Sequence, residues 1–361
     1  MCGIVGVIGR GQAAPLLLDA LKRLEYRGYD SAGVATVDTG GALHRTRAKG
    51  KLRNLETRLS AAPLPGETGI GHTRWATHGA PTEANAHPHT AHPVAVVHNG
   101  IIENFRALRD RLLGEGAIFN SETDTETIAH LLSHSLANHG DLKRALGETM
   151  AALEGAYALA FAFQDRPGVL AAARMGSPLA IGKSSEGTMI GSDAIALAPF
   201  CDEIIYLEDG DIALLTEHTI EVFDHRGHTV HRPHVPVPME VSVAEKGNFR
   251  HFMAKEIHEQ PEVLTHTISH YLDVAALTMK AERIPVDFQK VSRLSIAACG
   301  TAYYAALAAR YWFEGVAKLP VDLDVASEYR YRSQVLGADE LMLVVSQSGE
   351  TADTLASMRK A

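Results

Sequence analysis

Cys2 directly follows Met1 at the start of the chain, in the stretch MCGIVGVIGR. Initiator methionine is generally removed when the next residue is small, and its removal would leave Cys2 with both a thiol and a free α-amine. The reference pKa values are about 8.5 and about 7.7–8.0, so proton transfer from thiol to amine costs only about 1 kcal/mol. Such a terminus combines a nucleophile with its own general base. Taken alone, a cysteine at this position is also compatible with an inert side chain.

Four further stretches carry residue types that suit recognition of an amino acid. Arg74 in GHTRWATHG has a planar guanidinium that fits a carboxylate. Asn99 and Gly100 in HNG follow an apolar run, and together they favour an oxyanion hole. Asp124 in SETDTE is either an anionic ligand or only the N-cap of the next helix. Arg27 lies in the polar turn of LEYRGYDSAG.

A second group of residues, near the C-terminal end, has the composition of an anion site. SQSG at 346–349 follows an apolar run and precedes a helical pattern, and CGT at 299–301 repeats this arrangement one strand earlier. Hydroxyls, backbone N–H groups and a helix N-terminus together bind anions such as phosphate. Serine, glycine and threonine are also ordinary caps and turn residues, so either stretch alone is compatible with a purely structural role.

The secondary structure that must position these residues is expected to differ between three parts of the chain. Residues 2–225 contain short strands punctuated by Gly, Asp and Pro, together with amphipathic helices, which predicts an α+β domain with antiparallel strands. Residues 226–250 are rich in Pro and His and predict a linker. Residues 251–361 begin with a helix that we expect to be kinked or broken at Pro261. They continue as strand–helix alternation, which predicts a parallel sheet.

The composition limits the classes of function. A length of 361 residues favours two domains, and a net charge of −9 argues against general binding to nucleic acid or to an anionic membrane surface. No apolar run approaches the roughly 18 residues of a membrane span. The apolar stretch before Arg10 lacks the basic leader of a signal peptide. Three cysteines, Cys2, Cys201 and Cys299, cannot form a disulfide framework and fit a cytoplasmic protein.

Six stretches, in order along the chain, resemble the class II glutamine amidotransferases, and among them the glutamine–fructose-6-phosphate aminotransferases: CGIVGVIG, LEYRGYDSAG, GHTRWATHG, HPH, HNGIIENF and SETDTE. The resemblance covers nearly the whole chain. It implies an N-terminal-nucleophile αββα sandwich over residues 2–225, followed over residues 251–361 by an incomplete α/β parallel-sheet sugar-isomerase (SIS) domain. The implied reaction hydrolyses the glutamine side-chain amide through a Cys2 thioester. The ammonia is transferred to fructose 6-phosphate to give glucosamine 6-phosphate, with no cofactor or metal.

The resemblance also implies roles for individual residues. Asn99 and Gly100 would stabilise the oxyanion formed by Cys2 attack, with Arg27 near the nucleophile. Arg74 would bind the α-carboxylate of glutamine and Asp124 its α-ammonium. Further residues of that pocket would be Trp75 (as a gate), Thr77, His78 and His87. The sugar phosphate would be bound by Cys299, Gly300, Thr301, Ser346, Gln347, Ser348 and Thr351. One departure is Ala302, where the family commonly has serine.

The family has two SIS domains and is dimeric, whereas this chain reaches only three strands into the first SIS domain. We therefore expect a glutaminase rather than a complete synthase, because the isomerase residues and the imine-forming lysine would lie beyond Ala361. We also expect an open edge strand and an uncovered apolar face.

Three alternatives remain. Another class II amidotransferase, of the phosphoribosyl-pyrophosphate or asparagine-forming type, is disfavoured by SQSGETADT. An inactive sugar-phosphate-binding regulator would lack Cys2, Asn99 or Asp124, and all three are present. A metal role for HPHTAHP and HRGHTVHRPH is disfavoured because their spacings match no closed tetrahedral site.

Overall fold

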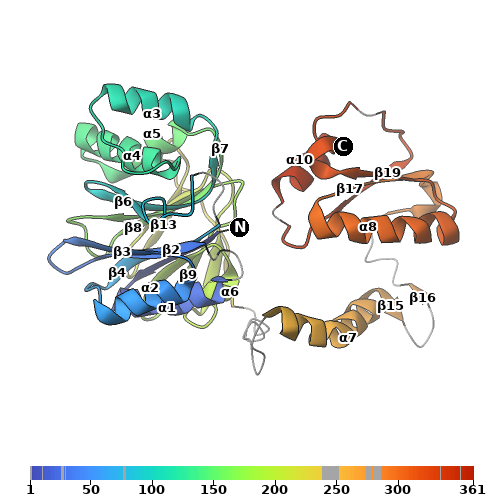
Figure 1. Cartoon of the computed structure of the whole chain (residues 1–361), viewed down its shortest axis with the longest axis horizontal. Coiled ribbons are helices and arrows are strands. Elements are labelled where there is room, and N and C mark those ends of the chain that lie inside the picture. Colours follow the sequence, from blue (N-terminus) through green and yellow to red (C-terminus); the bar gives the residue numbers. More distant parts are fainter. Residues whose placement is uncertain are drawn as a thin grey trace. The chain divides into compact units, whose positions relative to one another are not determined.

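The computed structural model describes residues 2–9, 11–25, 28, 30–75, 79–237, 252–273, 278–279, 286–333, 335–349 and 351–361. The chain divides into two compact units, Met1–Phe252 and Met253–Ala361 (Figure 1). Among the described residues, no helix combines the length and the apolar character needed to cross a membrane.

The first unit contains two antiparallel sheets that pack face to face (Figure 1). The larger sheet has the order β14-β11-β9-β10-β1-β4-β2-β3. Its strands are β1 (Gly3–Ile8), β2 (Ser31–Val37), β3 (Leu43–Lys49), β4 (Thr68–Arg74), β9 (Ala180–Ser184), β10 (Gly187–Gly191), β11 (Glu203–Tyr206) and β14 (His234–Pro236). The smaller sheet has the order β13-β12-β8-β7-β6-β5. Its strands are β5 (His89–Ala91), β6 (Val94–Ile102), β7 (Gly155–Phe163), β8 (Leu170–Met175), β12 (Ile212–Leu215) and β13 (Ile220–Phe223).

Helices cover the outer face of each sheet and complete an αββα sandwich, which confirms the predicted fold class (Figure 1). The larger sheet is covered by α1 (Ala13–Arg23), α2 (Leu52–Ala61) and α6 (Ala194–Leu197). The smaller sheet is covered by α3 (Phe105–Gly114), α4 (Thr125–His139) and α5 (Leu142–Ala152). Each sheet thus buries both of its faces, as layered domains require.

Strand β6 shows how the sequence pattern produces these layers. Val94 and Val96 belong to the core under the helices, whereas Ala95 and Val97 belong to the core between the sheets. This follows from the period of two in a strand, which points successive side chains to opposite faces. The same alternation, continued by two residues, determines where the side chains at 98 and 99 point.

The predicted linker differs from the structure over its first half. Strand β14 pairs with β11, and the Arg232 guanidinium donates to both carboxylate oxygens of buried Asp211, at 2.8 and 2.9 Å. Residues 226–237 therefore pack on the first unit. A composition rich in Pro and His is typical of a linker. It is also compatible with β14, because Pro is tolerated in a strand at the edge of a sheet. The remainder, 238–251, lies outside the described residues, and the division of the chain at 225 and 250 stays a prediction.

The second unit begins with α7 (Phe252–Tyr271), which continues across Pro261. The helix is therefore not broken there, and a kink at Pro261 stays a prediction. Short elements follow: β15 (Leu272–Asp273), β16 (Thr278–Met279) and a 3₁₀ turn (Phe288–Lys290). A parallel sheet of order β18-β17-β19 then forms, as predicted from the strand–helix alternation. It comprises β17 (Arg293–Ala298), β18 (Val321–Val325) and β19 (Glu340–Val345), with α8 (Gly300–Trp312), η5 (Phe313–Ala317), α9 (Ala326–Tyr329) and α10 (Ala352–Lys360).

Strand β19 is an edge strand within the described residues, since it pairs only with β17. Leu343 on this strand is partly exposed. An open edge in the whole protein, and aggregation from it, stay predictions.

Candidate active site

Cys2 is placed by the strand that follows it. Strand β1 lies inside the larger sheet between β10 and β4, and its Gly3 pairs with Thr73. A Cβ atom on Gly3 would lie 2.7 Å from Thr73 Oγ1 and 2.8 Å from Leu24 Cβ, so glycine is required for this approach. The backbone N–H of Trp75, just after β4, donates to Cys2 Sγ at 3.2 Å. The thiol is thus held at the end of two central strands.

The thiol of Cys2 is protonated at neutral pH unless a base acts on it. Burial raises the pKa of Cys2, while the Trp75 N–H and the nearby Arg74 charge act in the opposite direction. A general base is therefore needed to form the nucleophilic thiolate.

Two described residues of the stretch LEYRGYDSAG, Gly28 and Asp30, pack against the same strand end. A Cβ atom on Gly28 would lie 2.8 Å from the carbonyl carbon of Arg74, and the Asp30 N–H donates to Arg74 O at 3.1 Å. Arg27 itself, together with Thr77 and His78, lies outside the described residues. Their predicted roles remain predictions.

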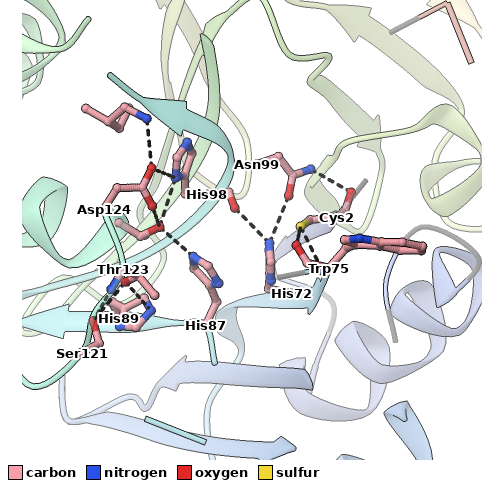
Figure 2. Close-up of polar contacts among 12 residues, drawn as sticks. Cys2, His72, Trp75, His87, His89, His98, Asn99, Ser121, Thr123 and Asp124 are labelled. Carbon is pink, nitrogen blue, oxygen red and sulfur yellow. Dashed lines mark hydrogen bonds and ion pairs between the residues drawn. The ribbon is translucent and has the colours of Figure 1, made fainter. Parts of the chain in front are cut away.

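Asn99 comes from the opposite sheet and reaches the nucleophile. Its Nδ2 donates to Cys2 O at 3.0 Å, and its Oδ1 lies 3.0 Å from His72 Nε2 (Figure 2). Gly100 follows with a φ of 131°, and a Cβ atom there would lie only 2.0 Å from Ala156 O. Both the backbone conformation and the contact with β7 therefore require glycine beside Asn99.

A pocket that opens to solvent lies at this junction. Six of the predicted site residues line it: Cys2, Arg74, Trp75, His87, Gly100 and Asp124. Three residues not predicted from the sequence line it as well: His98, Thr123 and Thr125. They belong to the stretches HNG and SETDTE, in which the sequence had indicated only Asn99, Gly100 and Asp124 as site residues.

The pocket carries one buried cation and one buried anion. Arg74 is 3% exposed, and its terminal nitrogens lie 3.4 Å from Gly79 O and from Ala80 O. Asp124 is 5% exposed and stands at the N-cap position of α4, yet its side chain accepts no backbone N–H of that helix and only the Thr125 hydroxyl, at 3.5 Å. It accepts the Ile102 N–H instead, at 2.9 Å. The N-cap explanation of Asp124 is therefore wrong, and the two charges suit a zwitterionic ligand.

Two histidines contact the threonine that follows Asp124. His87 Nε2 and His98 Nδ1 contact Thr125 Oγ1 at 2.8 and 3.0 Å (Figure 2). Burial holds the pKa of His87 well below its ordinary value, which keeps its ring uncharged at neutral pH. Among the described residues, no group of three or more His, Cys, Asp or Glu side chains is arranged to hold a metal ion.

A buried carboxylate holds the loop that presents Asp124. Glu126 is 2% exposed and accepts the backbone N–H groups of Asn120 and Ser121 at 2.8 and 2.7 Å, and the Ser121 hydroxyl at 2.7 Å. Thr123 Oγ1 contacts Ser121 Oγ and His89 Nε2 in turn (Figure 2). The final Glu of SETDTE therefore has a structural task that the sequence alone did not reveal.

Residues of the second predicted site lie at one edge of the parallel sheet. Ala298 and Val345 are register partners, so Cys299 and Ser346 leave neighbouring strands at the same carboxyl edge. Cys299 and Thr351 are the N-cap residues of α8 and α10, and neither caps its helix through its side chain. Ser346 Oγ accepts the Gly349 N–H at 3.0 Å and lies 3.1 Å from Thr351 Oγ1. The fold thus brings the two stretches together, as the strand pattern predicted.

Comparison with known proteins covers both units. A family model described as a glutamine amidotransferase domain matches residues 72–199, and an SIS domain model matches residues 287–361. The glutamine–fructose-6-phosphate aminotransferase (isomerizing) of Brucella suis biovar 1 is 56% identical over 359 residues, which is 99% of this chain. Over nearly its whole length, the chain is thus similar to a glutamine–fructose-6-phosphate aminotransferase. The member from Bradyrhizobium diazoefficiens is 54% identical over 362 residues, or 100% of this chain.

The chain spans 59% of the length of these two aminotransferases. Among solved structures, it resembles the glutamine phosphoribosylpyrophosphate amidotransferase of B. subtilis complexed with ADP and GMP, with a TM-score of 0.56 and 20% identity over 93% of this chain and 69% of that one. A structure described as the allosteric regulatory enzyme of purine biosynthesis gives the same TM-score and identity, over 96% and 69%. At this identity the likeness concerns the fold alone.

Proposed function

We propose that the first unit hydrolyses the side-chain amide of glutamine to glutamate and ammonia. The observation that supports this most directly is the hydrogen bond between Asn99 and Cys2, from two different sheets, beside a pocket that Cys2 lines together with Arg74 and Asp124. A nucleophile, an oxyanion donor and two opposite charges match an amino acid whose distal carbonyl is attacked.

The reaction uses the chain terminus as the base. After Met1 is removed, the Cys2 α-amine takes the thiol proton, and Sγ attacks the amide carbon of glutamine. The Asn99 Nδ2–H and the Gly100 N–H stabilise the oxyanion of the tetrahedral intermediate. This intermediate expels ammonia, which takes the proton from the α-ammonium, and leaves a thioester on Cys2. Water, activated by the free α-amine, then releases glutamate and regenerates the thiol.

Recognition of glutamine uses the opposite charges of the pocket. Arg74 binds the α-carboxylate and Asp124 the α-ammonium, and each charge-assisted bond contributes about 1.5–3 kcal/mol. The pocket is completed by Trp75, Thr77, His78 and His87, with Arg27 near the nucleophile. The Trp75 indole is 46% exposed, which fits a gate better than a core residue.

We infer that the full-length protein transfers the ammonia to fructose 6-phosphate and forms glucosamine 6-phosphate, as the names of its relatives indicate. The phosphate would bind at the sheet edge of the second unit, through Cys299, Gly300, Thr301, Ser346, Gln347, Ser348 and Thr351. Two helix N-termini and several hydroxyls favour an anion there. A homodimer in the cytoplasm completes this proposal, and the free cysteines fit that reducing compartment.

The experiment combines an intact-mass measurement with a glutaminase assay on wild type and Cys2→Ala. We expect a wild-type mass without Met1, release of glutamate, and a loss of at least about a thousandfold in Cys2→Ala. Cys201→Ala, at a buried cysteine outside the pocket, is the matched control and should retain activity. Hydrolysis by a protein that still carries Met1 would exclude the amine as base. No hydrolysis by protein that lacks Met1 would exclude the proposed function.

The acceptor half is tested by adding fructose 6-phosphate to the same chain. We expect glutamate but no glucosamine 6-phosphate. Formation of the amino sugar by this chain alone would show that residues 1–361 contain a complete synthase.

A further inference from the structure

We propose that His72 is a positioning residue that fixes the side-chain amide of Asn99, so that its N–H groups rather than its oxygen face the carbonyl under attack. This inference rests on the proposed glutaminase function. Neither the sequence patterns nor the family comparison singled out His72. It lies on β4, one residue before Thr73, and is completely buried.

The hydrogen-bond pattern determines the tautomer of His72. Its Nε2 lies 3.0 Å from the backbone oxygen of His98 and 3.0 Å from the side chain of Asn99 (Figure 2). A backbone carbonyl only accepts hydrogen bonds, so Nε2 carries the proton. The Asn99 atom that faces the same N–H must then be the acceptor Oδ1.

The other end of the Asn99 amide is determined independently. Its Nδ2 lies 3.0 Å from the backbone oxygen of Cys2, which again only accepts. If the amide were flipped, Asn99 Nδ2 would face the N–H of His72, which places two donors together. Asn99 Oδ1 would face Cys2 O, which places two acceptors together. One N–H of Nδ2 is held by Cys2 O, and the second N–H is left for the oxyanion.

The surroundings keep His72 in this one donor state. Burial lowers the pKa of His72 to about 3, and the charge of Arg74 and the His98 ring act in the same direction. Its Nδ1 is buried and has no hydrogen-bond partner among the described residues. The His87 ring packs 4.2 Å away, centroid to centroid, and is itself neutral. No positively charged form of His72 is therefore available to compete with the neutral donor near pH 7.

The test compares three substitutions with different reach. His72→Leu removes the donor, His72→Gln carries an N–H near the position of Nε2, and His72→Asn is polar but too short. We expect kcat for glutamine hydrolysis to fall about a hundredfold in Leu and Asn, as for loss of an oxyanion donor, and to recover within about fivefold of wild type in Gln. KM for glutamine should change less than about threefold, because His72 does not contact the substrate.

Two further measurements separate positioning from a merely structural role. Because His72 acts through Asn99, adding His72→Leu to Asn99→Ala should reduce kcat by less than about threefold beyond Asn99→Ala alone. Alkylation of Cys2 by iodoacetamide should proceed at the wild-type rate in His72→Gln and His72→Leu. Multiplying losses in the double variant, or equal activity of the Gln and Asn variants, would overturn the inference. A wild-type protein without glutaminase activity would instead reject the proposed function.

Discussion

Asp124 stands at a helix N-cap, but its side chain does not form the usual capping bond and can instead face a ligand. An Asp at a helix N-cap normally accepts N–H groups of its own first turn. Here α4 leaves that bond unmade, and the carboxylate turns toward Ile102 N and lines the pocket. Glu126 holds the preceding loop in place. Because the loop is held by another residue, the charge of Asp124 is available to a ligand.

Substitution Asp124→Asn should separate recognition from stability. Asparagine still accepts the Ile102 N–H, so the free energy of unfolding should change by less than about 1 kcal/mol. Loss of the charge should lower kcat/KM for glutamine about ten- to a hundredfold, mainly through KM. Steady-state kinetics and urea unfolding measure the two effects.

The matched control for Asp124→Asn is glutaramate, which is glutamine without its α-amine. Wild type should prefer glutamine over glutaramate, and the variant should lose that preference. An equal fall in activity toward both compounds would argue that Asp124 does not bind the ammonium.

At the scale of elements, strand β6 directs site residues to both faces of its sheet. Its alternation sends His98 toward Thr125 on α4 and Asn99 toward Cys2 on the facing sheet. Gly100 then lets β6 lie against β7 in a backbone conformation that other residues rarely adopt. The oxyanion donor is therefore positioned by a strand whose register is set by hydrophobic residues upstream.

Gly100→Ala should consequently disrupt both the strand and the chemistry. The added Cβ would lie 2.0 Å from Ala156 O, so β6 must shift and carry Asn99 with it. We expect a destabilisation of at least about 3 kcal/mol and a loss of glutaminase activity. Gly140→Ala is the control, because Gly140 also has positive φ, at 69°, but nothing lies within 4 Å of its Cβ position. It should cost only about 1–2 kcal/mol. Similar stabilities of the two variants in urea would contradict this account.

At the scale of the whole molecule, the buried histidines link the first unit's stability to pH. Burial lowers the pKa of His72, His87 and His89 below the ordinary value of 6.5. The unfolded chain therefore binds more protons than the folded chain once the pH falls below about 6.5. Stability is fully present above that pH and is lost as the pH falls toward the folded-state values.

We expect the free energy of unfolding of the first unit to fall between pH 6.5 and pH 5. Each of the three histidines contributes a slope of up to about 1.4 kcal/mol per pH unit. Carboxylates titrate mostly below this pH range, so they contribute little to the slope of the unfolding free energy within it. Urea unfolding at pH 7.5, 6 and 5 measures the slope, and His89→Gln, which keeps a partner for Thr123, should reduce it. A flat profile would contradict the neutral state of these rings.

The sequence by itself predicted the residues of the candidate site and most of the elements. Local patterns are enough for this, because strand alternation, glycine punctuation and the residue types of HNG or SQSG depend on near neighbours along the chain. They also placed the carboxyl ends of β17 and β19 together, since parallel strands share that edge. Cys2, Arg74, Asn99 and Asp124 could therefore be predicted as site residues from the sequence, and their roles stay predictions.

Only the tertiary structure shows which other residues hold these side chains in place. His72 and Asn99 are 27 positions apart, and their hydrogen bond exists only because two sheets pack face to face. The packing of residues 226–237 and the released side chain of Asp124 likewise depend on partners distant in sequence, β11 and Ile102. A linear pattern shows what a side chain can do, whereas the contacts that orient it and set its charge arise when the layers close around it.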